Sequence, residues 1–248
     1  MDKDIVLKAE HLKKCYGERT IIEDINLKLG RGELVSLLGV SGVGKSTLFQ
    51  VLSGLKKPEE GRVWLRDEEI TGVPGKISYM LQKDLLLKHK KIIDNVSLPL
   101  VLKGMKKQDA RTEAGKLFDQ FGLEGTQLQY PGELSGGMRQ RAALLRTYLA
   151  SDGVALLDEP FSALDTLTKA SVHNWYLKVM EEIELSTIFI THDIEEAILL
   201  SDRIYILSGQ PGRIQEEIVI REPKPRPQNF DLTEAFLSYK KEIVEKLL

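Results

Sequence analysis

The segment GVSGVGKST at residues 39–47 combines glycines, a lysine and hydroxyl side chains at a spacing suited to binding phosphate. It satisfies the pattern G-x-x-x-x-G-K-[ST]. Glycines let successive backbone N–H groups turn toward phosphate oxygens, and the positive end of a following helix adds to the attraction. Lys45 would reach the β- and γ-phosphates, and the Ser46 hydroxyl would hold Mg²⁺. We therefore predict a nucleoside triphosphate site formed by Gly39, Val40, Ser41, Gly42, Val43, Gly44, Lys45, Ser46 and Thr47.

Two adjacent carboxylates follow a second apolar run, VALLDEP at residues 154–160. Asp158 and Glu159 come directly after four apolar residues, which is typical of the end of a buried strand, so both side chains can project into a cleft. Asp158 is placed to hold Mg²⁺ through water, and Glu159 to orient or deprotonate an attacking water. A solvated acidic loop would not explain the apolar residues that lead into the pair.

The segment LSGGMRQR at residues 134–141 is a second helix start suited to phosphate. Two glycines beside a hydroxyl leave backbone N–H groups exposed toward an anion. The chain already has a phosphate loop almost a hundred residues earlier, at 39–47. The sequence therefore raises the question of whose phosphate this second segment contacts.

The apolar pattern predicts the strands that position these groups. Residues 5–9 and 25–29 alternate with period two, as half-buried antiparallel strands do. Residues 33–39 form a continuous apolar run that ends in glycine, which is typical of a central strand. Further central strands are predicted at 77–81, 153–157, 186–190 and 203–207. Helices fill most of the gaps, so the pattern indicates a layered α/β domain.

Three helical stretches have apolar faces in the sequence. After Lys45 the face comprises Leu48, Val51, Leu52 and Leu55, and Gly54 lies close to the helix end. A core stripe comprises Val172, Trp175, Tyr176, Val179, Met180 and Ile183. Between about 83 and 151 helix follows helix, with a face that ends at Gly122 and comprises Ala110, Ala114, Leu117, Phe118 and Phe121.

These patterns predict one domain over 1–248. Its α/β core with an N-terminal β subdomain covers 1–82 and 152–220, and a helical subdomain is inserted at 83–151. A proline-rich connector and a final helix occupy 221–248. Asp231 and Glu234 resemble a capping box for that helix, which could pack on its own domain or contact a partner.

Composition excludes several classes of protein. The 248 residues are 42% apolar, enough for a sizeable core, and the net charge of −2 argues against a nucleic-acid binder. The one cysteine, Cys15, excludes an internal disulfide and indicates a reducing compartment. We expect a soluble chain, because the start resembles no secretory signal and no run approaches the ~18 apolar residues of a membrane span.

Seven motifs together resemble the ATP-binding cassette (ABC) family, in the family's order and over nearly the whole chain. They are CYG with Tyr16, GVSGVGKST, LQ with Gln82, LSGGMRQR, LLDEP, SALD with Asp165, and TH with His192. The resemblance implies a P-loop NTPase ABC cassette of α/β class, with an N-terminal antiparallel β subdomain and an inserted α-helical subdomain. It also implies an ATPase that uses ATP and Mg²⁺.

The resemblance assigns roles to single residues. Tyr16 would stack on adenine, although it could also be an ordinary loop aromatic. Gln82 would contact Mg²⁺ or the attacking water, so the implied metal-binding residues are Ser46, Gln82 and Asp158. His192 would contact the γ-phosphate, and with Glu159 and Gln82 it completes the implied catalytic set. Asp165 would bridge to a second subunit, or cap the next helix.

The resemblance also answers the question raised by residues 134–141. Two cassettes of this family pair head to tail, so this segment of one chain meets the γ-phosphate held by the other. The residues implied to act on the partner's ATP are Leu134, Ser135, Gly136, Gly137 and Met138.

Within the family, YPGELSGGMRQR and SDRIYILSGQPGRI look like the nitrate/sulfonate/taurine-type importer ATPases. Gly132, where the family usually has histidine, and LLRTYLA at 144–150 depart from that pattern. Relatives of this subgroup also serve vitamin precursors.

The importer resemblance implies transmembrane permease subunits, a second copy of the chain and a solute-binding protein as partners, and the cytoplasmic face of the membrane as location. The basic run KHKK at 88–91 would assist permease docking or form a solvated face. The alternative function is a soluble ATP-switched clamp that binds another macromolecule and moves no solute.

Overall fold

Two β-sheets form the centre of the protein. The computed structural model describes residues 4–247 apart from 163–165, 225 and 228. The first sheet is antiparallel with the order β2-β1-β4-β5, and its strands are β1 (Ile5–Tyr16), β2 (Arg19–Gly30), β4 (Glu60–Leu65) and β5 (Glu68–Glu69). The predicted antiparallel pair at 5–9 and 25–29 is confirmed as the first part of β1 paired with the last part of β2.

The second sheet carries the phosphate loop at residues 39–47, called the P-loop below, and the acidic pair Asp158 and Glu159. Its order is β10-β9-β3-β8-β7-β6, and its strands are β3 (Leu34–Leu38), β6 (Ser78–Met80), β7 (Val154–Asp158), β8 (Ser186–Thr191), β9 (Arg203–Ser208) and β10 (Arg213–Val219). β3 pairs in parallel with both β8 and β9, which confirms its predicted central place. β10 is an antiparallel edge strand.

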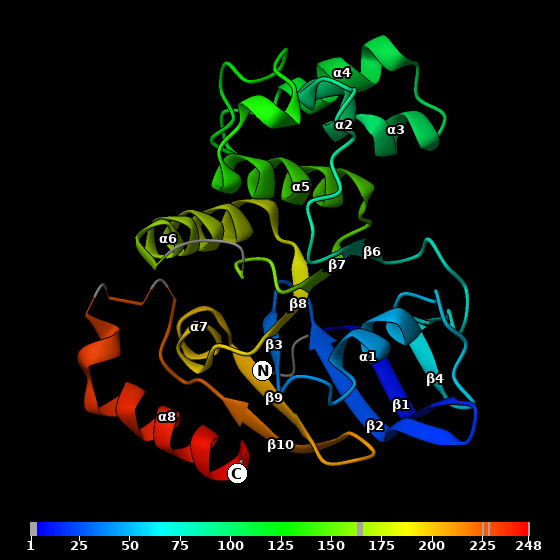
Figure 1. The fold of residues 1–248 in the computed structure, drawn as a ribbon, viewed down its shortest axis with the longest axis vertical. Coiled ribbons are helices and arrows are strands. Elements are labelled where there is room, and N and C mark those ends of the chain that lie inside the picture. Colours follow the sequence, from blue (N-terminus) through cyan, green and yellow to red (C-terminus); the bar gives the residue numbers. More distant parts are fainter. Residues whose placement is uncertain (1–3, 163–165, 225, 228, 248) are drawn as a thin grey trace.

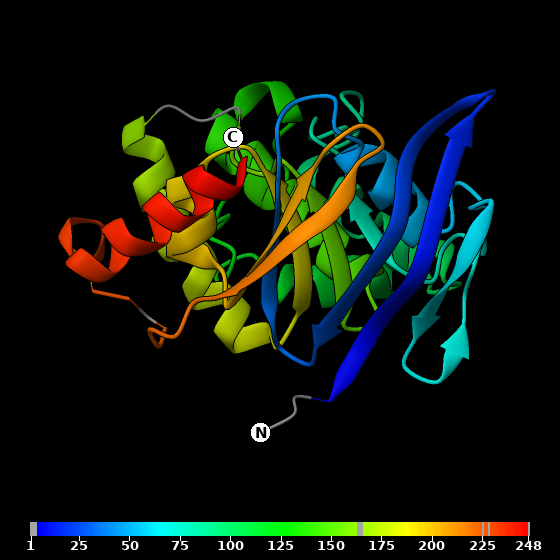
Figure 2. The same cartoon turned by 90° about the horizontal axis from the view of Figure 1, so that it is seen from below.

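The helices divide into two groups (Figure 1). One group, at one end of the molecule, consists of α2 (Ile92–Val96), α3 (Leu98–Leu102), α4 (Lys107–Gly115) and α5 (Gly136–Ala150). The other helices lie along the two sheets: α1 (Lys45–Leu52), α6 (Thr166–Ile183), α7 (Ile194–Leu200) and α8 (Glu234–Leu247). Figure 2 shows the antiparallel sheet on one side of the core strands, and α7 and α8 on the other. Among the described residues, no helix combines the length and apolar character needed to cross a membrane.

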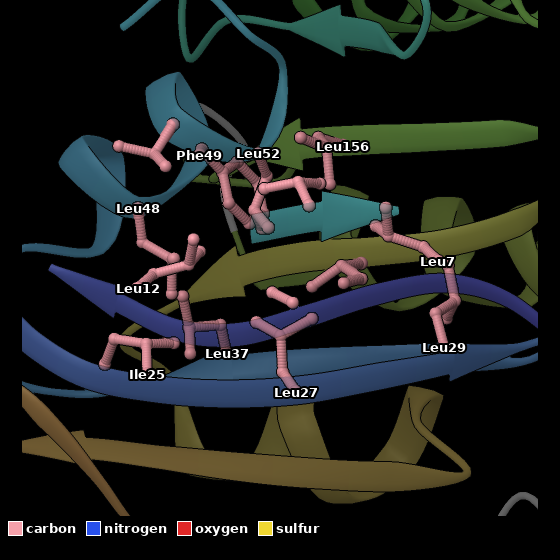
Figure 3. Close-up of a cluster of buried hydrophobic side chains, with 14 of the residues drawn as sticks. Leu7, Leu12, Ile25, Leu27, Leu29, Leu37, Leu48, Phe49, Leu52 and Leu156 are labelled. Atoms are coloured by element: carbon pink, nitrogen blue, oxygen red, sulfur yellow. The ribbon is translucent and has the colours of Figure 1, made fainter. Parts of the chain in front are cut away.

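One apolar cluster joins the two sheets through α1 (Figure 3). Side chains of β1, β2 and β3 meet the inner face of α1, and the fully buried members include Leu7, Ile25, Leu37, Phe49 and Leu52. Burial of one such side chain stabilises the fold by about 1.5–3 kcal/mol. The P-loop therefore lies between a rigid strand and a helix that is fixed along its inner face.

A second apolar cluster joins the helical group to the core sheet. It includes Leu157 of β7, Phe189 of β8 and residues from α5 and α6. Val172, Tyr176, Val179 and Met180 are buried, as the predicted core stripe requires. A third cluster lies between α7, α8 and β9.

Three local expectations were wrong. The helix predicted as far as Phe121 ends at Gly115, and a series of turns buries Phe118 and Phe121 instead. Leu55 is exposed, because α1 ends at Leu52 and Gly54 has a φ of +75°.

The third wrong expectation concerns the final helix. Asp231 does not cap it, because residues 230–232 form a separate 3₁₀ turn. The Thr233 hydroxyl accepts the bond from the Phe236 N–H at 3.2 Å and so occupies the capping position of α8.

Candidate nucleotide site

The P-loop connects β3 to α1, and two of its glycines are required by their surroundings. Gly44 has a φ of +112°, and a Cβ atom there would lie 2.7 Å from Cγ2 of Ile22. A Cβ atom on Gly39 would lie 2.4 Å from the Leu207 carbonyl oxygen. Any larger residue would displace the loop from the antiparallel sheet on one side or from β9 on the other.

Lys45 opens α1 and folds back over the loop. Its Nζ donates to the carbonyl oxygens of Gly39 at 2.6 Å and Val40 at 3.0 Å. Burial lowers the pKa of Lys45, and the nearby Glu159 and Asp158 charges oppose that effect. No side chain among the described residues caps α1 at Gly44, so the N–H groups of its first turn face outward. The loop thus presents a cation and backbone donors to an anion.

The three predicted catalytic residues meet at the carboxyl ends of neighbouring strands. β6 and β7 pair with Met80 opposite Leu157, so two residues further on Gln82 lies level with Glu159. Gln82 Nε2 donates to Glu159 Oε2 at 3.0 Å. His192, just after β8, has Nδ1 at 3.3 Å from Glu159 Oε1. Glu159 therefore lies between Gln82 and His192. All three lie at the carboxyl ends of the strands, where ligands of open α/β sheets bind.

The backbone conformation of Glu159 sets the direction of its side-chain carboxylate. Its φ of +47° is uncommon for a residue with a side chain and costs on the order of 1–3 kcal/mol. Hydrogen bonds hold the turn, because the Glu159 N–H donates to Ile190 O at 3.1 Å and the Ser162 hydroxyl donates to Glu159 O at 3.0 Å. The strained turn places Glu159 out of line with β7 while Asp158 stays in the strand.

Asp158 is buried and accepts two hydroxyl bonds. Its exposed fraction is 8%, and Tyr79 of β6 donates its hydroxyl to Asp158 Oδ2 at 3.1 Å. The second donor is the Ser46 hydroxyl. Burial raises the pKa of Asp158 and also that of Tyr79, whose hydroxyl is therefore protonated and available as a donor. Sequence reasoning missed Tyr79, although a phenol in the apolar run ISYML close before Gln82 was a usable signal.

The donor set suits a magnesium ion that arrives with the nucleotide. Ser46, Asp158 and Gln82 offer hard oxygen atoms, which Mg²⁺ prefers. No cluster of three acidic, histidine or cysteine side chains able to hold a metal exists among the described residues. A site with so few protein ligands matches an ion that keeps phosphate oxygens and waters in its shell.

Tyr16 ends β1 and leaves its ring accessible. The residue is 45% exposed, its hydroxyl donates to Gln50 Oε1 at 3.4 Å, and Lys14 Nζ lies 5.7 Å from the ring centroid. An exposed aromatic face near the P-loop helix is what stacking on a base requires.

The segment 134–138 lies away from this chain's own phosphate loop. It begins α5 in the helical group, whereas α1 lies beside the antiparallel sheet (Figure 1). Ser135 is exposed, and its Oγ accepts the bond from the Met138 N–H at 3.3 Å. Leu134 is only 4% exposed and packs in the core of the helical group. The exposed part of the segment is therefore Ser135 with Gly136, and Gly137 is half-buried.

Two further placements concern the loops around the acidic pair. Asp165 lies outside the described residues. Asp193, next to His192, was not singled out in the sequence, and its carboxylate accepts bonds from the N–H groups of Glu195 at 3.0 Å and Glu196 at 3.2 Å. This cap fixes the start of α7 directly after His192.

Comparisons with known proteins agree with this geometry. The family model described as ABC transporter matches residues 22–162. The formylaminopyrimidine import ATP-binding protein ThiZ of Halalkalibacterium halodurans is 47% identical to this chain. The match covers 83% of this chain and 81% of ThiZ. The aliphatic sulfonates import ATP-binding protein SsuB 2 of Burkholderia cenocepacia is 39% identical, over 86% of this chain and 78% of its own.

A solved structure extends the match. The dimeric post-hydrolysis state of the ATP-binding cassette MJ0796, bound to ADP and Pi, superposes with a TM-score of 0.74 at 30% identity, over 88% of this chain and 100% of that one. The cassette fold and the resemblance to sulfonate-type importer ATPases are thus confirmed. The chain belongs to the ABC transporter family and is an ATP-binding, ATP-hydrolysing cassette of that family.

Proposed function

We propose that the chain hydrolyses Mg-ATP at the edge of the core sheet and so drives import of a small organic solute. The observation that carries the catalytic part is the position of Glu159, whose carboxylate lies between Gln82 and His192 at 3.0 and 3.3 Å. These three groups sit at the same sheet edge as the P-loop.

Each residue has a distinct task in this proposal. Lys45 and the open N-terminus of α1 bind the phosphates, and Tyr16 stacks on the base. Glu159 accepts a proton from the attacking water, which Gln82 helps to orient, and His192 contacts the γ-phosphate. Ser46, Asp158 and Gln82 hold Mg²⁺, which neutralises charge on the β- and γ-phosphate oxygens when bound.

A second copy of the chain completes each site. Ser135, Gly136, Gly137 and the backbone of Leu134 and Met138 in one chain would face the γ-phosphate in the other, and Asp165 would contact the partner. A helix N-terminus contributes about 0.3–1 kcal/mol to anion binding when exposed. It contributes more in a closed, dry interface, so ATP would hold the dimer together until hydrolysis releases it.

The proposed solute is a sulfonate, taurine-like compound or vitamin precursor such as formylaminopyrimidine. The names of SsuB 2 and ThiZ, and that of the taurine import ATP-binding protein TauB of Escherichia coli O157:H7, which is 37% identical, support this range. The subunit would bind a transmembrane permease at the cytoplasmic face of the membrane, with a solute-binding protein in the same system and no nucleic acid. The helical subdomain at 83–151, with the basic run at 88–91, would form the docking side of the cassette.

The test is capture of this subunit from gently solubilised native membranes, followed by uptake assays. We expect a polytopic permease among the bound proteins, and uptake of taurine, an alkanesulfonate or formylaminopyrimidine that is lost when the subunit is deleted. Recovery of soluble macromolecules without a permease would contradict the transport role. Recovery of a permease with no uptake of these compounds would contradict only the solute class.

A further inference from the structure

Tyr79 connects three elements of the site through one side chain. It belongs to β6, and its ring packs edge-on against Phe49 of α1, with centroids 5.8 Å apart and planes at 81°. Its hydroxyl reaches the end of β7 and donates to Asp158 Oδ2 at 3.1 Å. The strand before Gln82 is thus tied both to the helix that follows the P-loop and to the acidic pair.

The Asp158 carboxylate has little freedom to find other donors. It is 8% exposed, and the Ser46 hydroxyl is the second hydrogen-bond donor. A carboxylate held by two hydroxyls on different elements keeps one orientation, because rotation would break one hydrogen bond of a buried group. The packing of Phe49 fixes the ring of Tyr79, and this in turn fixes the Tyr79 hydroxyl that donates to Asp158.

We propose that Tyr79 is a positioning residue for magnesium, which orients the Asp158 carboxylate beside Ser46 so that the metal–nucleotide complex meets a preformed oxygen site. The inference rests on the magnesium site proposed above. Tyr79 does not touch the nucleotide or the reacting atoms, and it acts only through Asp158. Residues that orient a metal ligand in this way commonly change metal affinity about 10–100-fold when they are removed.

The variant Tyr79→Phe isolates the hydroxyl, because it keeps the ring contact with Phe49. We expect the half-saturating Mg²⁺ concentration for binding of a fluorescent ATP analogue to rise roughly tenfold. Nucleotide affinity measured in EDTA should stay at the wild-type value, and the hydrolysis rate should approach that of wild type at saturating Mg²⁺. Tyr79→Met, which also lacks the hydroxyl, should produce the same shift and serves as a second, independent replacement.

Tyr205→Phe is the matched control. Tyr205 also has a buried hydroxyl, which donates to the Lys28 carbonyl oxygen at 3.3 Å, away from Asp158. Its loss should change thermal stability and leave the Mg²⁺ dependence unaltered. A shift in Mg²⁺ dependence of equal size in this control would assign the effect to general destabilisation and overturn the proposal.

Ser46→Ala separates failure of this inference from failure of the metal site. If Ser46→Ala raises the Mg²⁺ requirement while Tyr79→Phe and Tyr79→Met stay within twofold of wild type, Tyr79 has no positioning role. If Ser46→Ala itself leaves the Mg²⁺ dependence unchanged, the magnesium site is wrong, and the inference about Tyr79 falls with it.

Discussion

At the scale of single residues, the site brings buried and exposed charged groups close together: Lys45 and Asp158 are buried, whereas His192 is exposed. Lys45 is held by two backbone carbonyls, Asp158 by two hydroxyls, and Glu159 by Gln82 and His192. Groups that hydrogen bonds hold in place before the ligand arrives need little reorganisation to act on a bound phosphate. The proposed mechanism assigns binding to Lys45 and hydrolysis to Glu159, so single substitutions should separate the two steps.

Glu159→Gln should bind ATP with wild-type affinity and lose hydrolysis by at least about a hundredfold, because the amide cannot accept the proton of the attacking water. Phosphate release and equilibrium binding of ATP measure the two effects. Lys83→Gln, an exposed change next to Gln82, is the control and should retain the wild-type rate. Turnover of the Glu159→Gln protein near the wild-type rate would remove Glu159 from the proposed mechanism.

At the scale of elements, strands with a strong apolar signal could be predicted and weakly patterned ones could not. β3, β7 and β8 are buried along their whole length, so their runs stand out in the sequence. β10 reads RIQEEIV, and among its residues only Ile218 is buried, so no pattern marked it as an edge strand. The helix predicted to Phe121 failed because turns can bury aromatic side chains as well as a helix can.

The same limit applies to the site. The parallel register brings the ends of β6, β7 and β8 together, so motif residues that follow those strands had to converge. The individual hydrogen bonds between these residues depend on side-chain geometry. The bond from Tyr79 to Asp158 and the contact between His192 and Glu159 follow from rotamers and from the φ of +47° at Glu159, and no spacing rule encodes these.

One ion pair joins two helices of the helical group. Asp94 of α2 accepts from Arg111 of α4 through three contacts of 2.8 to 3.0 Å, and Lys107 lies 3.4 Å away. Asp94 has a side-chain exposure of 13%, so solvent screens the pair only partly. The bond from Arg111 lowers the pKa of Asp94. The pair should therefore stabilise the packing of α2 on α4.

Asp94→Asn should lower the thermal midpoint by about 2–4 °C, which corresponds to about 1 kcal/mol in a chain of this size. Because the folded pKa of Asp94 is lowered, its contribution is fully present above the unfolded value of about 4 and is lost as the pH falls through the folded value. Melting curves of wild type and variant should thus stay apart between about pH 5 and 8, begin to converge below about pH 4, and meet only below the lowered folded pKa of Asp94.

Asp119→Asn is the control for that prediction, because Asp119 is an exposed carboxylate in the same part of the chain. Its melting curve should follow that of wild type at each pH. A constant gap between wild type and Asp94→Asn down to the lowest pH would show that charge pairing is not the source of the stability.

At the scale of the whole molecule, the two phosphate-facing helix starts cannot serve one nucleotide in one chain. α1 begins beside the antiparallel sheet and α5 begins in the helical group (Figure 1). In the proposed head-to-tail dimer, a two-fold pair of chains would bring the two starts together twice, once for each nucleotide. The cassette MJ0796, similar at a TM-score of 0.74, is dimeric and bound to ADP and Pi, which supports the proposal of a dimer.

This arrangement predicts how charge at Ser135 affects assembly. In a Glu159→Gln background, Mg-ATP should convert the chain to a dimer, measured by size-exclusion chromatography with light scattering. Ser135→Asp keeps a side chain that caps helices well, so α5 should stay folded. It also places a negative charge against the partner's γ-phosphate, so the double variant should bind ATP and remain a monomer.

Ser135→Asn in the same background separates charge from size, because asparagine caps equally well and is neutral. It should dimerise at higher protein concentration than the parent but far more readily than the aspartate variant. The difference between the two should shrink as salt is raised, because ions screen the repulsion while the interface is still open. Equal dimerisation of both variants would mean that residue 135 does not face the partner's phosphate, and the head-to-tail pairing would have to be abandoned.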